Sequence, residues 1–170
     1  QVAALEKLAV IDPLAVGDVR PFWDLIVAPG HETIVHAGRE ELNFCLHATG
    51  KRPANLFDVQ LAAGFVSYEY PAGYASLLNR MLGITLEKGE TRTDWRRRPL
   101  SKPQLQYALD DVRHLQAIRD VLHERLTARG RLEWLYEELK TWQDEVDDYR
   151  HREHWRKVSG NNGLNRRSLG

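Results

Sequence analysis

The sequence has one cysteine, Cys45, one methionine, Met81, and no net charge. A single cysteine excludes an internal disulfide and any zinc site built from several cysteines, and it suits a reducing compartment. The 24 Lys and Arg residues balance the 24 Asp and Glu residues, so no overall positive field draws the chain to nucleic acid or to a membrane. Any affinity for a polyanion must therefore come from a local patch.

Long apolar runs are lacking too. No stretch approaches the roughly 20 apolar residues of a membrane span, and the start lacks the basic and then apolar pattern of a signal peptide. We therefore expect a cytoplasmic protein with no membrane partner. Because the chain begins at Gln1 and its methionine is Met81, we also expect residues upstream in the natural protein. Its 170 residues, 42% of them hydrophobic, suffice for one main core with an appendage.

The first half of the sequence alternates between strand and helix patterns. Short apolar or β-branched runs predict strands at residues 2–3, 8–11, 33–36 and 55–59. Helical spacing is found at residues 22–27, at 37–50, where Gly50 is a stop signal, and at 61–65. Alternation of this kind indicates an α/β layer arrangement.

The second half of the sequence is mostly helical. Helices are predicted over residues 74–82, 101–130 and 132–146, and Ser101 is a suitable N-cap for the second of them. A polar loop at residues 87–99 combines Trp95 with five basic side chains: Lys88, Arg92, Arg96, Arg97 and Arg98. This loop is either a cationic patch that contacts phosphate or a solvated loop that Trp95 fixes to the core, and both interpretations stay open.

The helix predicted over residues 101–130 carries two adjacent acids that face different ways. Its core face is formed by Leu105, Ala108, Val112, Leu115, Leu122 and Leu126. Asp110 lies opposite that face and should be solvated. Asp111 lies on the edge of the core face, one turn after Tyr107. A carboxylate aimed inward needs a cation or hydrogen bonds, so Asp111 is either a ligand for a cation or a hydrogen-bond acceptor at a helix-packing corner.

A second acidic candidate follows the strand that ends at His36. The carboxyl end of a strand, where a helix begins, is the usual place for a ligand in an open α/β sheet, so Glu41 is well placed to reach a site. The alternatives are that Glu40 and Glu41 only complement the helix dipole, and that His36 is a histidine satisfied within the structure. Both alternatives stay open from these residues alone.

Four sequence blocks, taken in order, resemble ribonuclease D, a 3′-5′ exonuclease of the ribonuclease H-like fold. They are VHAGREEL at 35–42, LFDVQLAA at 56–63, ETRTDW at 90–95 with RPL at 98–100, and YALDDV at 107–112. The resemblance covers about residues 1–142 and implies a mixed sheet flanked by helices. The family's first motif, an Asp-x-Glu on the central strand, does not occur here in a strand context, so the fold is expected to be N-terminally incomplete.

The resemblance also implies how the rest of the chain is divided. Residues 1–142 would form a partial exonuclease domain, and further helices would follow it. Residues 143–154 would form a linker. Residues 155–170 resemble the start of a helicase-and-RNase-D C-terminal (HRDC) domain, a small helical module that binds nucleic acid.

Site residues follow from the resemblance, motif by motif. The family's three motifs supply four acids that hold two divalent cations, Mg²⁺ or Mn²⁺. Tyr107 and Asp111 match the third motif in its tyrosine version, and Glu41 falls where the second motif normally has aspartate. Asp111 and Glu41 would bind the metals and Tyr107 would orient the attacking water. Contacts to RNA would come from His36 at the terminal nucleotide and from Lys88, Arg92 and Arg96 along the backbone.

The resemblance implies a metal-dependent 3′-5′ exoribonuclease that trims the 3′ ends of single-stranded RNA, such as tRNA precursors. An alternative is a catalytically decayed RNA-binding relative, in which Glu41 in place of aspartate marks the decay. A third hypothesis is a structural domain without a site. On the first hypothesis we expect His36, Glu41, Tyr107 and Asp111 to share one cleft.

Overall fold

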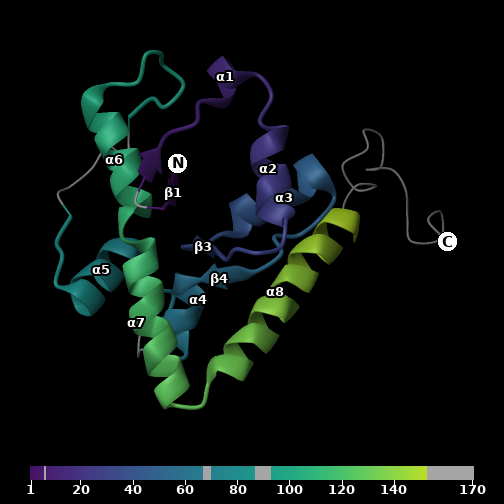
Figure 1. The fold of residues 1–170 in the computed structure, drawn as a ribbon, viewed down its shortest axis with the longest axis vertical. Coiled ribbons are helices and arrows are strands. Elements are labelled where there is room, and N and C mark those ends of the chain that lie inside the picture. Colours follow the sequence, from purple (N-terminus) through teal and green to yellow (C-terminus); the bar gives the residue numbers. More distant parts are fainter. Residues whose placement is uncertain (6, 67–69, 87–92, 153–170) are drawn as a thin grey trace, which may run out of the picture.

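The computed structural model describes residues 1–5, 7–66, 70–86 and 93–152. Within these ranges, eight helices surround two separate pairs of strands (Figure 1). No helix in the described ranges combines the length and apolar character that crossing a bilayer requires.

The first pair of strands is an N-terminal hairpin. Strand β1 (Val2–Ala4) runs antiparallel to β2 (Lys7–Ala9), with Val2 opposite Ala9. Helices α1 (Pro13–Val16) and α2 (Arg20–Val27) follow, and the side chain of Asp12 caps α1 by accepting from the Leu14 N–H at 3.1 Å. The guanidinium of Arg98 donates to both oxygens of Asp12, at 2.6 and 2.9 Å. This ion pair ties the end of the 93–99 loop to the hairpin side of the molecule.

The second pair of strands belongs to a β-α-β unit. Strand β3 (Thr33–Val35) runs parallel to β4 (Leu56–Asp58), with Val35 opposite Asp58. Helix α3 (Arg39–Thr49) connects them and ends at Gly50, whose φ of +69° is the left-handed conformation that the glycine stop predicted. Helix α4 (Val59–Gly64) begins directly after β4. The carboxyl ends of both strands therefore meet at one edge, where Val35 faces Asp58.

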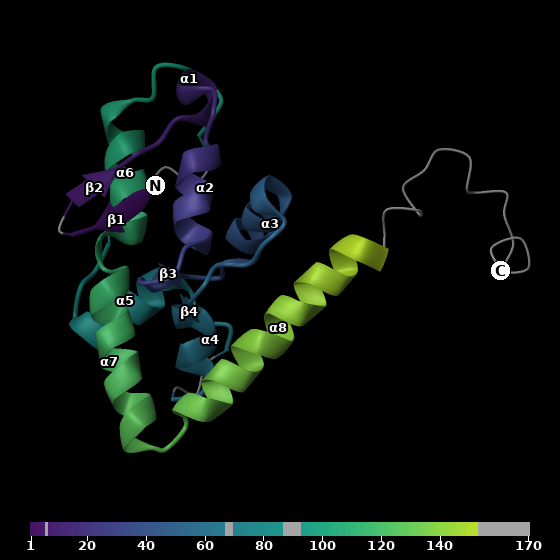
Figure 2. The ribbon, with the colours of Figure 1, turned by 45° about the vertical axis from the view of Figure 1, so that its right-hand side comes forward.

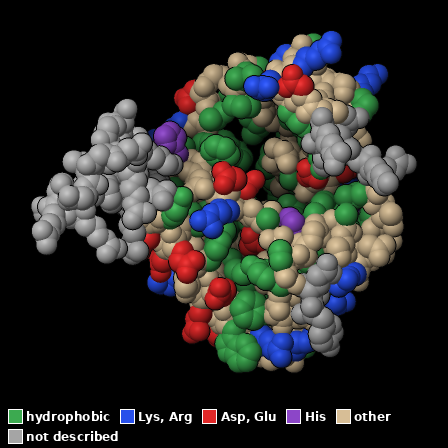
Figure 3. All heavy atoms as spheres, turned by 180° about the vertical axis from the view of Figure 1, so that it is seen from behind, with side chains coloured by type: hydrophobic (Ala, Val, Ile, Leu, Met, Phe, Trp, Pro, Cys, Tyr) green, Lys and Arg blue, Asp and Glu red, His purple; other side chains and the backbone are tan. Residues whose placement is uncertain are grey.

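The two pairs of strands do not form one sheet. Hydrogen-bonded pairing is found within each pair only, among the residues that the structure describes. In Figure 2 the β1–β2 hairpin lies against α6 (Lys102–Arg113), away from β3 and β4. Figure 3 shows a hollow on the face opposite to that of Figure 1. This arrangement agrees with a mixed sheet that lacks a strand between the hairpin and β3.

The remaining helices correct the sequence analysis in two places. The helix predicted over 101–130 is two helices, α6 and α7 (Leu115–Ala128), which are separated at His114 with φ −110° and ψ 5°. The last helix, α8 (Leu132–Arg152), extends beyond residue 146 and through most of the predicted linker. The predicted cap is present, since the Ser101 hydroxyl accepts from the Gln104 N–H and the Gln104 side chain accepts from the Ser101 N–H. Helix α5 (Tyr74–Leu82) has its predicted bounds.

The main core lies between β4, α4, α5, α7 and α8. Phe57 of β4 is fully buried there, among side chains that include Ile118, Leu122, Leu126 and Leu135. A smaller cluster joins α3 to α8. Leu105, predicted to lie on the core face, is 37% exposed instead. It lies near the start of α6, which packs mainly on the hairpin and reaches the main core at its other end, through Val112.

Replacing Phe57 by alanine should lower the free energy of unfolding by about 3–5 kcal/mol, because it removes a fully buried ring and leaves a cavity. The matched control is Phe44→Ala on α3, since Phe44 is 59% exposed and its loss should cost less than about 1 kcal/mol. Urea denaturation followed by circular dichroism measures both. Equal losses for the two variants would contradict the assignment of the core.

Candidate active site

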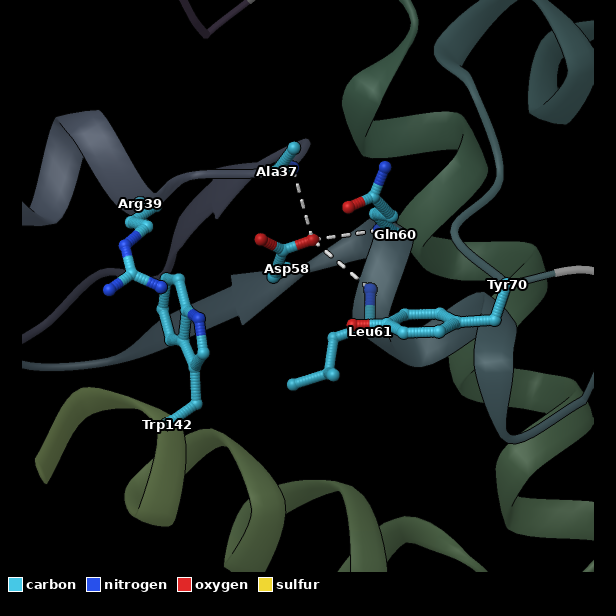
Figure 4. Close-up of a pocket in the computed structure, with 7 residues that line it drawn as sticks. All are labelled: Ala37, Arg39, Asp58, Gln60, Leu61, Tyr70 and Trp142. Atoms are coloured by element: carbon cyan, nitrogen blue, oxygen red, sulfur yellow. Dashed lines mark hydrogen bonds between the residues drawn. The ribbon is translucent and has the colours of Figure 1, made fainter. Parts of the chain in front are cut away.

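The turn between β3 and α3 is held by the buried carboxylate of Asp58. Its Oδ1 accepts from the backbone N–H groups of Ala37 at 3.3 Å, Gln60 at 2.8 Å and Leu61 at 3.2 Å (Figure 4). Its Oδ2 accepts from the Gly38 N–H at 2.9 Å. One side chain that is only 3% exposed thus joins the turn to the first turn of α4.

The geometry of this turn restricts its residues. Ala37 has φ +54°, a left-handed conformation that non-glycine residues seldom adopt. At Gly38, a Cβ atom would lie 2.4 Å from Cγ2 of Val35, so any larger residue would require either Val35 or the turn to shift. The turn connects His36, directly after β3, to Glu41, in the first turn of α3. Its geometry therefore sets the positions of the Cα atoms of both residues.

A pocket of about 170 Å³ lies beside the same turn. Arg39 and Trp142 are on one side of it and Tyr70 is on the other, with Asp58 between them (Figure 4). None of the residues that the resemblance assigns to a metal lines this pocket.

His36 is fixed by contacts with the segment that leads into α5. Its Nε2 lies 2.9 Å from the carbonyl oxygen of Ala72, which also accepts from the side-chain amide of Gln60 at 3.1 Å. Because a carbonyl oxygen can only accept, Nε2 carries the hydrogen. The imidazole ring also contacts the ring of Tyr74, with 5.7 Å between their centroids.

Asp111 is half-buried beside His36. Burial raises the pKa of its carboxyl group, and the neighbouring charge of Asp110 raises it further, whereas His36 and the amino group of Gln1 lower it. Within the described ranges, the Asp111 carboxylate makes no hydrogen bond or ion pair. The hydrogen-bonded packing corner considered above is therefore not observed among these residues.

Asp110 has different surroundings. Its carboxylate accepts from the Gln106 side chain at 2.9 Å and from Arg113 Nε at 2.9 Å. Burial acts to raise the pKa of Asp110, but these two hydrogen bonds outweigh it and lower the pKa. The helix geometry predicted different surroundings for the two acids, and the structure confirms that they differ: Asp110 is paired near the surface, while Asp111 is half-buried and has no hydrogen-bond or ion-pair partner among the described residues.

Tyr107 lies close to Asp111. Burial raises the pKa of the Tyr107 hydroxyl and the charge of Asp111 raises it further, so at neutral pH the hydroxyl keeps its proton and can donate. Its ring contacts that of Trp95, at 6.0 Å between centroids. Trp95 therefore holds the 93–99 loop against α6, whereas one of the two interpretations of this loop expected it to contact the core.

The other predicted residues are less closely tied to this group. Glu41 is exposed, and the structure gives no contact between it and Asp111. The side chain of Arg96 is 94% exposed and lies 3.5 Å from that of Asp94. Lys88, Arg92 and residues 155–170 lie outside the described residues. The structure thus brings together His36, Tyr107 and Asp111.

These residues do not complete a metal site by themselves. Carboxylate oxygens are the donors that Mg²⁺ and Mn²⁺ prefer, so Asp111 and Glu41 are of the right chemical kind. However, no three or more Asp, Glu, His or Cys side chains converge anywhere in the described ranges. A divalent cation held at Asp111 would need further carboxylates from outside these ranges.

The sequence analysis missed two residues of this region. Asp58 ends a strand just before a helix, and an aspartate in that position is a recognisable N-cap signal. Tyr74 contacts His36 and α6, but it lies 36 residues before its hydrogen-bond partner, Asp110, and no local pattern marks it.

Comparisons with known proteins agree with this fold. A sequence profile described as 3′-5′ exonuclease matches residues 1–127. The ribonuclease D of Shewanella sp. (strain ANA-3) is 44% identical over 133 residues, and that of Desulfotalea psychrophila is 36% identical over 171 residues. The crystal structure of Escherichia coli RNase D, an exoribonuclease involved in structured RNA processing, superposes with a TM-score of 0.78 at 36% identity.

These matches cover most of this chain but a smaller share of each relative. The Shewanella and Desulfotalea alignments cover 78% and 97% of the chain, and 34% and 45% of those proteins. The Escherichia coli superposition covers 84% of the chain and 38% of the other protein. The resemblance to ribonuclease D and the ribonuclease H-like fold are thus confirmed.

Replacing Asp58 by alanine should lower the free energy of unfolding by about 2–4 kcal/mol, because four backbone N–H groups lose their shared acceptor. Asp24→Ala is the matched control, because Asp24 is an exposed acid whose pair with Arg20 should contribute less than about 1 kcal/mol. Chemical denaturation measures both variants. A loss below 1 kcal/mol for Asp58→Ala would mean that the turn does not depend on this carboxylate.

Proposed function

Because the chain belongs to the 3′-5′ exonuclease family, we propose that the whole protein shortens RNA from its 3′ end by metal-dependent hydrolysis of phosphodiester bonds. The proposed substrates are single-stranded RNA 3′ ends such as those of tRNA precursors, and the proposed location is the cytoplasm. One observation carries the proposal: Asp111 is half-buried next to Tyr107 and His36, and no hydrogen-bond or ion-pair partner for it is found in the described part of the chain.

An inward-facing carboxylate without a partner is costly, because burial removes water, and at Asp111 no side chain or backbone group of the described residues replaces that water. A divalent cation would offset that cost, and it would also supply an activated water and a neutralised phosphate for phosphodiester hydrolysis. Two such ions, Mg²⁺ or Mn²⁺, are proposed, with Asp111 and Glu41 among the ligands. Because the described residues hold too few acids, the proposal requires further carboxylates, expected on a strand that fits between the two pairs of strands.

The other residues are given roles that match their surroundings. Tyr107 keeps its proton and lies near Asp111, so its hydroxyl can hydrogen-bond and orient a water. The His36 ring, fixed through Nε2, is proposed to contact the terminal nucleotide. Arg96 is well exposed and is proposed to bind the RNA backbone, together with Lys88 and Arg92.

The division of the chain is also a proposal. Residues 1–142 are taken as the exonuclease domain, residues 143–154 as a connection whose first part continues α8, and residues 155–170 as the start of an HRDC domain. The last segment would add a further surface for nucleic acid.

The second candidate is an RNA-binding relative whose metal site has decayed. It is favoured by the exposed position of Glu41, where the family has aspartate, and by the incomplete acidic group. Activity measurements on the full-length protein separate the two candidates.

Replacing Asp111 by asparagine in the full-length protein should lower the exonuclease rate by about 10²-fold or more, because a negative charge is lost where a cation is stabilised. The matched control is the adjacent Asp110→Asn, which changes a surface pair and should stay within about threefold of the wild type. A 5′-labelled RNA oligonucleotide resolved on a denaturing gel measures both, and EDTA should abolish the wild-type reaction. Digestion that continues in excess EDTA would contradict the proposed function.

Glu41→Gln should also lower the rate by about 10²-fold, because the charge is removed at almost constant shape. Glu40→Gln is the matched control, since a residue that acts only on the helix dipole should change the rate little. Glu41→Asp separates an adapted site from a decayed one: we expect lower activity, because the shorter side chain moves the carboxylate away by more than about 1 Å. Wild-type rates for Glu41→Gln would assign Glu41 to the helix dipole alone.

A further inference from the structure

The break between α6 and α7 leaves two backbone groups without their helical partners. In a continuous α-helix, the N–H of His114 would donate to the carbonyl oxygen of Asp110. Instead, His114 has φ −110° and ψ 5°, and its N–H turns toward the carbonyl oxygen of Val112. The Asp110 carbonyl oxygen therefore needs a hydrogen-bond donor other than the His114 N–H.

That donor is the hydroxyl of Tyr74, from the first turn of α5. It donates to the Asp110 carbonyl oxygen at 3.0 Å. Burial raises the pKa of Tyr74 to about 12, although a hydrogen bond from the His114 N–H opposes the rise. The hydroxyl thus lies between the carbonyl and the N–H that a continuous helix would pair directly. A side chain inserted into the helical hydrogen-bond ladder is a recognised cause of a kink.

Tyr74 also connects this break with the candidate active site. Its ring contacts that of His36, and its hydroxyl is close enough to Asp111 to be influenced by that charge. In Figure 1, α5 lies beside the junction of α6 and α7, and α5 packs against α7. Asp111 follows the residue that Tyr74 binds, so a movement of the Asp110 carbonyl would be passed on to it directly.

We propose that Tyr74 is a positioning residue, whose hydroxyl holds open the break between α6 and α7 and thereby sets the direction of the Asp111 carboxylate. This inference rests on the proposed function, in which Asp111 binds a divalent cation. The break allows α6 to pack on the hairpin while α7 packs on the main core. Without the hydroxyl, the Asp110 carbonyl and the His114 N–H would be free to pair, and the turn that carries Asp111 would shift. Displacements of about 1 Å are enough to cost about 10²-fold in a catalytic rate.

The test is Tyr74→Phe in the full-length protein, which keeps the ring and removes only the hydroxyl. We expect the Kd for Mn²⁺, measured by titration without RNA, to rise about tenfold. We also expect kcat on a single-stranded RNA oligonucleotide to fall about tenfold while KM stays unchanged, and added Mn²⁺ to restore part of the rate.

Two tyrosines serve as controls, Tyr136→Phe and Tyr149→Phe, because both side chains are exposed on α8, which contains neither Tyr74 nor the break. Both should match the wild type in Mn²⁺ affinity and in kcat. A Tyr74→Phe protein that equals the wild type in these quantities would overturn the inference while leaving the proposed function intact. Loss of cooperative unfolding in Tyr74→Phe would also overturn it, because the hydroxyl would then be a determinant of stability. A wild-type protein that neither binds Mn²⁺ nor shortens RNA would remove the proposed function and this inference together.

Discussion

Four backbone N–H groups converge on one carboxylate, that of Asp58, and the arrangement of the β-α-β unit depends on this interaction. It joins the turn after β3 to the start of α4, at the edge where both parallel strands end. The side chains of His36 and Glu41 leave the backbone on either side of that turn. Any catalytic geometry involving them is therefore set by a residue that has no chemical role of its own.

Asp58 and Asp111 show how two inward-facing acids can be distinguished. Asp58 is almost completely buried, but backbone N–H groups replace the water that it has lost. Asp111 is buried less, yet it has no hydrogen-bond or ion-pair partner within the described ranges, and burial raises the pKa of its carboxyl group. The hydrogen bonds from backbone N–H groups alone explain how the Asp58 carboxylate can be buried. The Asp111 carboxylate has no such acceptor role among the described residues, and for this reason we place the proposed chemistry at Asp111.

Local patterns predicted much of this structure. Periodicity located the short strands and α5, Ser101 and Gly50 marked helix ends correctly, and helical geometry separated Asp110 from Asp111. The break at His114 could not be predicted in this way, because the hydroxyl at the break comes from Tyr74, which is distant in sequence. The exposure of Leu105 follows from the same break, since periodicity assumed one straight helix with one core face. The position of the helix break and the exposure of Leu105 thus depend on contacts between segments that are distant in sequence, which local patterns do not contain.

The unpaired edges of the two strand pairs and the separation of Asp111 from Glu41 are related features of the structure. Both β1–β2 and β3–β4 are two-stranded, so each presents edges whose N–H and C=O groups have no strand partner among the described residues. Helix α6, which carries Asp111, packs on the hairpin, whereas Glu41 belongs to the β3–β4 unit. A strand between them would satisfy two edges at once and fix the separation of these two acids. A strand in that position would therefore also suit the further carboxylates that the proposed function requires, because its side chains would lie between α6 and the β3–β4 unit.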